Sequence, residues 1–172
     1  MSLTQMNLPN PVMQAMELAP QLLRECDPFP PLIVALDTDS SIFVDLLADV
    51  FAAGVSPETQ RAQLQTLLRK NGIVAYALMI KSQLFPAVTI PKDFDANPSN
   101  SVAKPKQRLS PFCESPQLII DQIITITYEE THQPTARYWQ AAAYRQGEEV
   151  GLDQFQELTV VPASGLWVGL LD

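Results

Sequence analysis

Hydrophobic residues recur at helical spacing in three stretches of residues 10–70, and these predict three helices. The first begins at Asn10-Pro11, an expected N-cap followed by a proline at the first helical position, and it runs to Cys26. Pro20 interrupts this pattern, so we expect the helix to kink or split there. The second helix is expected over residues 42–54, and the third over residues 57–70, after the capping residue Ser56.

Short apolar runs and alternating segments predict strands in the rest of the chain. Residues 32–36 and 73–80 are apolar runs that favour buried strands, although periodicity alone would also allow a helix. Residues 117–130 end in strict alternation, and residues 136–146 also alternate, with three consecutive alanines that suit a helix as well. A turn at residues 146–148 would close a hairpin. Residues 152–158 indicate a helical turn, and residues 159–162 and 165–171 indicate closing strands.

A proline-rich segment divides these two groups of elements. Five of residues 91–117 are Pro, and Ser, Asn and Lys fill much of the rest, so we expect a long flexible loop. The sequence therefore predicts an α+β fold: a helix-rich N-terminal half (10–90) with one or two short strands, the Pro-rich connector (91–117), and a mostly antiparallel β segment (118–172). A segment of about 55 residues buries too little apolar surface to be comfortable alone, so we expect 1–172 to form a single domain.

Charge and composition narrow the classes of function. The formal net charge is −8 and the sequence pI about 4.5, which disfavours nucleic acid and anionic membranes as partners. The chain has two cysteines, Cys26 and Cys113, and a single histidine, too few ligands for a structural zinc site. Neither a basic, apolar leader nor an apolar run of membrane-spanning length is evident. We expect a soluble, cytoplasmic protein.

One short motif carries candidate chemistry. The apolar run at residues 32–36 ends in Asp37-Thr38-Asp39-Ser40-Ser41, which resembles the first motif of haloacid-dehalogenase-type phosphatases. That resemblance implies Asp37 as nucleophile and Asp39 as general acid and base, both beside Mg²⁺. The family's further Ser or Thr, Lys and late acidic pair have no clear counterparts here. The alternative, which we favour, is a polar turn that caps a helix beginning at residue 42.

The remaining candidates concern binding. Lys104, Lys106 and Arg108 form a short basic tract in the Pro-rich segment, suited either to solubility or to docking on an acidic partner. Arg137 and Arg145 flank Trp139 at strand spacing, a composition favoured at protein interfaces. With no complete catalytic set, the sequence favours a non-catalytic interaction, regulatory or assembly module without a cofactor, which binds a protein partner or itself. A Mg²⁺-dependent phosphatase-like hydrolase using Asp37 and Asp39 is the alternative.

Overall fold

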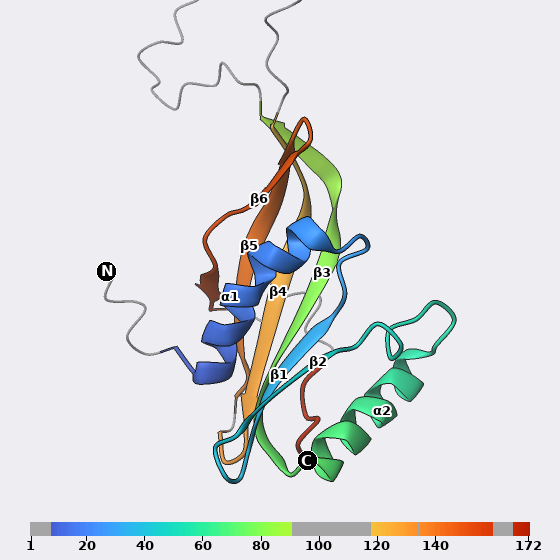
Figure 1. Cartoon of the computed structure of the whole chain (residues 1–172), viewed down its shortest axis with the longest axis vertical. Helices are drawn as coiled ribbons and strands as arrows, with labels where there is room; N and C mark the ends of the chain where they lie inside the picture. The colour runs from blue at the N-terminus through green and yellow to red at the C-terminus, as the bar shows by residue number, and fades with distance from the viewer. Residues whose placement is uncertain (1–7, 91–117, 134, 160–166) are drawn as a thin grey trace, which may run out of the picture.

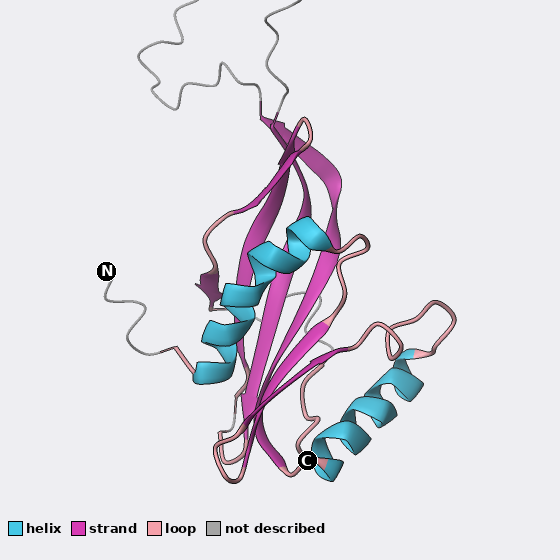
Figure 2. Cartoon of the chain, viewed as in Figure 1, coloured by secondary structure: helices cyan, strands magenta, loops and turns pink. Residues whose placement is uncertain are grey.

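The protein is an antiparallel sheet with one helix on each face (Figures 1 and 2). The structure, a computed structural model, describes residues 8–90, 118–133, 135–159 and 167–172, with the side chains of residues 84–90 not described. In chain order the elements are α1 (Asn10–Glu25), β1 (Leu32–Asp37), β2 (Ile42–Leu46), α2 (Pro57–Lys70), β3 (Ile73–Ile90), β4 (Leu118–Glu130), β5 (Arg137–Gln146), β6 (Glu149–Leu152) and β7 (Gln156–Leu158).

The sheet has the strand order β2-β1-β3-β4-β5-β6, and all its neighbouring strands are antiparallel. The short strand β7 pairs with β5 further along the same side that β6 occupies. Strands β3 and β4 pair from Ala75 with Glu130 to Ile90 with Leu118, so the chain on both sides of residues 91–117 contributes to one sheet. One edge of the sheet is therefore β2, and the other edge is divided between β6 and β7.

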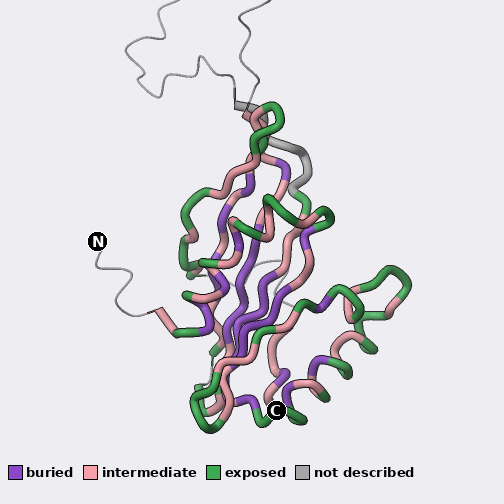
Figure 3. The backbone as a smooth tube through the Cα atoms, in the orientation of Figure 1, coloured by how far each residue is buried: buried purple, intermediate pink, exposed green. Residues whose placement is uncertain are grey.

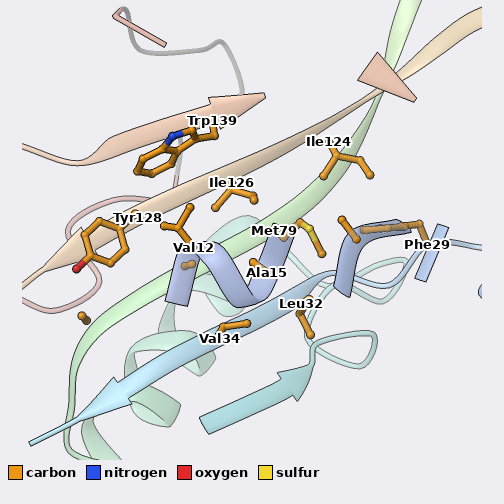
Figure 4. Packing of buried hydrophobic residues seen from close by; sticks show 13 residues of the cluster. Val12, Ala15, Phe29, Leu32, Val34, Met79, Ile124, Ile126, Tyr128 and Trp139 are labelled. Atoms are coloured by element: carbon orange, nitrogen blue, oxygen red, sulfur yellow. The ribbon is translucent and has the colours of Figure 1, made fainter. Parts of the chain in front are cut away.

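Helix α1 packs on one face of this sheet. Because strand side chains alternate between faces, Leu32 and Val34 of β1 share this face with Met79 of β3 and with alternate residues of β4. Figure 4 shows these side chains beneath Val12 and Ala15 of the helix, with Trp139 of β5 at one end of the cluster. Small residues on the inner side of α1, such as Ala15 and Ala19, let the helix approach the strands closely.

Helix α2 and the last residues of the chain cover the opposite face. Leu64 and Leu68 of α2 pack with Leu170 in a second cluster, which also contains the residues of β1 and β3 that point away from α1. Figure 3 shows that buried positions concentrate in the central strands between the two layers. Residues 167–172 are not a strand: they lie against α2 and the sheet, so the closing strand expected over 165–171 is wrong in its described part.

The fold is α+β, but the prediction of a helix-rich N-terminal half is wrong. Residues 42–54 contain strand β2 and turns, not a helix. Ile42, Val44 and Leu46 alternate with Phe43 and Asp45, and pairing with β1 uses this two-residue period rather than the helical one that the same residues also fit. The predicted helical turn at residues 152–158 is wrong as well, since β6 and β7 occupy most of that stretch.

Several other predictions from the sequence are confirmed. Strands were found where residues 32–36, 73–80, 117–130 and 136–146 predicted them, and β3 extends well past residue 80. Helix α2 begins as expected, because the Ser56 side chain accepts a hydrogen bond from the Thr59 N–H. Helix α1 remains one element through Pro20, and it begins at Asn10 itself, with no side-chain cap at the preceding Pro9.

Candidate functional site

The Asp37–Ser41 segment forms the hairpin turn between β1 and β2. One carboxylate oxygen of Asp37, Oδ1, accepts hydrogen bonds from the backbone N–H groups of Asp39 (2.9 Å) and Ser41 (2.8 Å). Ser40 completes the reversal with a φ of 63°, and its N–H donates to the Asp37 carbonyl. Aspartate commonly stabilises turns in this way, by bonding the backbone two residues on. Asp37 therefore organises a hairpin, and the expected cap for a helix at residue 42 is wrong.

This geometry gives no support to a magnesium site. Asp37 Oδ1 is already engaged by two backbone donors, and the segment leads into an antiparallel strand rather than a helix. Within the described ranges, no three His, Cys, Asp or Glu side chains gather closely enough to hold a metal ion. Mg²⁺ is usually held by one or two carboxylates, with water or phosphate oxygens completing its octahedral geometry, so the two carboxylates of the turn do not by themselves decide the question. Among the described residues no third acid joins Asp37 and Asp39, so the phosphatase hypothesis stays an untested alternative.

Arg137 and Trp139 lie together, as their spacing implied, but both make contacts with other residues of the same chain. The Trp139 ring is 2% exposed in the α1 cluster, and the Arg137 guanidinium lies 4.8 Å from its centroid. Arg137 also makes a two-pronged ion pair with Glu157, with Nε–Oε1 and Nη2–Oε2 distances of 2.7 and 3.0 Å. This hydrogen-bonded pairing lowers the pKa of Glu157 and raises that of Arg137.

Arg145 is separated from this group and pairs with Asp121 of β4. Asp121 lies at an irregularity of the β4–β5 register, and its other carboxylate oxygen is buried without a hydrogen-bond partner. Lys104, Lys106 and Arg108, the third part of the expected binding set, lie outside the described residues. The structure therefore brings together Arg137 and Trp139 only, and the role of the whole set in binding stays a prediction.

A groove of about 700 Å³ lies beside Trp139, between α1 and the segment that connects β6 to β7. Its walls are mainly apolar, with carboxylate and amide side chains on the β6–β7 side. Glu157 lines the groove but is held by Arg137, and Asp153 accepts a hydrogen bond from the N–H of Gln154. The residues that line it are Leu8, Met16, Pro20, Trp139, Leu152, Asp153, Gln154, Phe155, Gln156 and Glu157.

A partly buried polar cluster fixes the C-terminal residues to the sheet. Glu129 Oε2 accepts hydrogen bonds from the Tyr76 hydroxyl (2.6 Å) and the Gly169 N–H (2.8 Å). Arg61 of α2 donates to the Gly169 carbonyl at 3.1 Å. Gly169 is therefore bonded both to the sheet, through its N–H, and to α2, through its carbonyl. Burial, and then the hydrogen bond and charge of Glu129, raise the pKa of Tyr76 far above its usual value. The cluster has a structural role, because its polar groups bond to one another and to the backbone.

The outer edge of β2 is the feature that sequence reasoning missed. Of the large apolar side chains that the structure describes, three are exposed: Met13 (38%), Val44 (46%) and Leu46 (51%). Val44 and Leu46 lie on the α1 face of the sheet, opposite Val34 and Leu32 of β1, but α1 packs mainly over β1, β3, β4 and β6. With the half-buried Ile42 they form a continuous apolar strip at the edge of the sheet.

Hydrogen bonding shows which backbone groups this edge presents. The Asp37 N–H donates to the Ser41 carbonyl, and the Leu47 N–H donates to the Pro31 carbonyl. Since antiparallel pairs alternate between bonded and non-bonded, residues 43 and 45 bond to β1, and residues 42, 44 and 46 point their N–H and C=O groups outward. No strand among the described residues pairs with this side. The alternation of Ile42, Val44 and Leu46 was the available signal, and a helical interpretation concealed it.

Comparison with known proteins assigns no relationship to this fold or site. No protein-family model matches the chain, and the searches of curated proteins and of solved structures found no match either. None of the helices in the described part of the chain is long and apolar enough to cross a membrane. We therefore infer the function from the geometry alone.

Proposed function

We propose that this protein is a non-catalytic interaction module that binds an extended polypeptide along the outer edge of β2. The observation that carries the proposal is the apolar strip Ile42, Val44 and Leu46, whose side chains and outward backbone groups lie together at an edge that no described strand covers. Such an edge is a template for another strand, since main-chain hydrogen bonds supply affinity and alternate side chains supply specificity.

The two edges of the sheet support this proposal by their difference. Natural proteins protect sheet edges with short strands, charges, prolines or bulges. The edge opposite β2 consists of β6 and β7, which have four and three residues and carry Glu149 and Glu157. β2 has five consecutive residues, no proline and no lysine, and its one charge, Asp45, lies on the face away from the strip. The β2 edge therefore lacks the protection that its counterpart has.

The contacts of Arg137 and Trp139 within the protein make the β2 edge the better-supported binding surface. The Arg137 guanidinium is engaged by Glu157, and Trp139 is buried in the α1 cluster. The geometry gives the magnesium-dependent alternative no support either, because Asp37 holds the β1–β2 turn. The hairpin that Asp37 stabilises is instead what positions β2 beside β1.

Selection from a displayed library of random heptapeptides tests the proposal directly. The full-length protein, immobilised sparsely, should enrich peptides with alternating apolar residues. Val44→Pro should abolish the enrichment, because it removes an outward N–H while leaving every β1–β2 hydrogen bond intact. Leu46→Lys should do the same without altering the backbone.

Met13→Lys is the matched control, since it adds the same charge at another exposed apolar residue, on α1. It should leave peptide enrichment unchanged. Circular dichroism and thermal unfolding establish that each variant is folded. An absence of enrichment, or enrichment equally strong in folded Val44→Pro and Leu46→Lys proteins, would show that the β2 edge is not a binding site.

A further inference from the structure

We infer that the strand which pairs with β2 is β2 of a second copy, related by a two-fold axis beside Val44. This inference rests on the proposed function, and it adds the identity of the partner and the register of the pairing. It follows from three properties of the edge: the positions of its outward hydrogen-bonding groups, the arrangement of its apolar side chains, and the placement of its single charge.

The outward backbone groups are symmetric about Val44. They belong to residues 42, 44 and 46, so an antiparallel copy centred on Val44 places residue 42 opposite residue 46 of the partner and residue 44 opposite itself. In this register each opposed pair exchanges two hydrogen bonds, and all six outward N–H and C=O groups of each strand are used. A shift by one residue would oppose outward groups to inward ones and leave them unpaired.

The side chains are self-complementary in the same register. A two-fold axis perpendicular to the sheet keeps both copies of α1 on one face, where the strips join. Val44 then contacts its own counterpart, and Ile42 contacts Leu46 of the second copy, so the two most exposed residues of β2 gain apolar neighbours. On the other face Asp45 lies opposite Phe43, so no like charges are directly opposed.

Area and charge set the strength of this association. A single pair of five-residue strands buries less than the roughly 1,200 Å² of a standard stable interface. Each copy also carries a formal net charge of −8, which opposes association at low ionic strength. We therefore expect a reversible dimer with a Kd on the order of 10–1,000 µM, strengthened as added NaCl screens the repulsion.

Sedimentation analysis from about 10 µM to 1 mM should show the mass rise from monomer to dimer, at lower concentration in 0.5 M than in 0.05 M NaCl. Val44→Lys and Leu46→Lys should remain monomeric, with Kd raised at least about tenfold by the charges that they place in the strip. Met13→Lys should dimerise like the unaltered protein. A monomer throughout, or a dimer equally stable in folded Val44→Lys, overturns the inference.

Cysteine cross-linking tests the register. In a chain with Cys26→Ser and Cys113→Ser, Val44→Cys should form a dimer through one disulfide, because directly opposed bonded residues have Cα atoms about 5.5 Å apart. Ile42→Cys mixed with Leu46→Cys should give only the mixed disulfide, identified by mass. Neither should cross-link to itself, since its two copies would lie about 13 Å apart along the strands. Self-linked Ile42→Cys, or an unlinked Val44→Cys, overturns the pairing.

Failure of this inference is distinguishable from failure of the proposed function. A protein that stays monomeric but selects alternating heptapeptides, with the selection lost in Val44→Pro, keeps its binding edge and takes a strand from another protein. A protein that neither dimerises nor selects peptides has no binding function at β2.

Discussion

Replacing Leu170 with alanine tests whether the C-terminal residues hold α2 on the sheet. The Leu170 side chain has no exposed surface, and it lies in one cluster with Leu64 and Leu68 of α2 and Tyr76 of β3. The neighbouring Gly169 is bonded through its N–H to Glu129 and through its carbonyl to Arg61. These bonds limit how far the backbone can move to fill the cavity that the substitution creates. Leu170→Ala should therefore lower the free energy of unfolding by most of what an unfilled cavity costs.

The expected loss is about 2–4 kcal/mol of unfolding free energy, within the range for buried Leu→Ala substitutions. A protein of this size loses about 2–4 °C of melting temperature per kcal/mol, so the midpoint should fall by about 5–15 °C. Urea unfolding followed by circular dichroism gives the free energy. Hydrogen exchange should rise more in α2 than in α1, because α2 depends on this segment for its contacts.

Leu171→Ala is the matched control, since its side chain is only partly buried. It should cost less than about 1 kcal/mol. If Leu170→Ala costs no more than Leu171→Ala, or if exchange rises equally in both helices, then the last residues do not anchor α2 and the reasoning is refuted.

Three further outcomes follow from the described contacts. Burial keeps Tyr76 protonated in the folded protein while the unfolded chain ionises near pH 10, so stability should fall as pH rises above about 10, by up to about 1.4 kcal/mol per pH unit. Urea unfolding between pH 9.5 and 11 should show a shallower decline in Tyr76→Phe; parallel declines would contradict the assignment. Ser56→Ala should cost about 1 kcal/mol by removing the α2 cap, measured against Thr135→Ala as an exposed hydroxyl control outside the helices. Mg²⁺ titration should leave the melting temperature of the protein and of Asp37→Asn unchanged relative to matched ionic strength; a saturable shift lost in Asp37→Asn would restore the metal hypothesis.

Local signals predicted the elements that local chemistry determines. The Ser56-Pro57-Glu58 sequence marks a helix start whatever surrounds it, and α2 begins there. The alternation at the end of β4 and along β5 also predicted strands, although the three alanines of β5 left a helix open. β4 and β5 pair with each other, so the antiparallel C-terminal part of the sheet could be predicted.

Long-range contacts determined what could not be predicted. Residues 167–171 look like a strand in isolation, but Glu129 and Arg61 bind their backbone about 40 and 108 positions away in sequence. The turn at Asp37 was read as a helix cap because both structures use the same side-chain-to-backbone hydrogen bond. Only the pairing of β2 with β1 distinguishes the two, and no local pattern specifies that pairing.

The error at residues 42–54 and the proposed function have a common cause. Ile42, Val44 and Leu46 supply more apolar surface than one copy of the protein buries, and Phe43, Leu47 and Phe51 face a different cluster. Together these residues are apolar enough to satisfy a helical period and a strand period at once. The other sheet edge is short and charged, and the proposed pairing with a second strand would bury the apolar residues that are exposed at β2. The ambiguity in the sequence is therefore itself consistent with a surface completed by association.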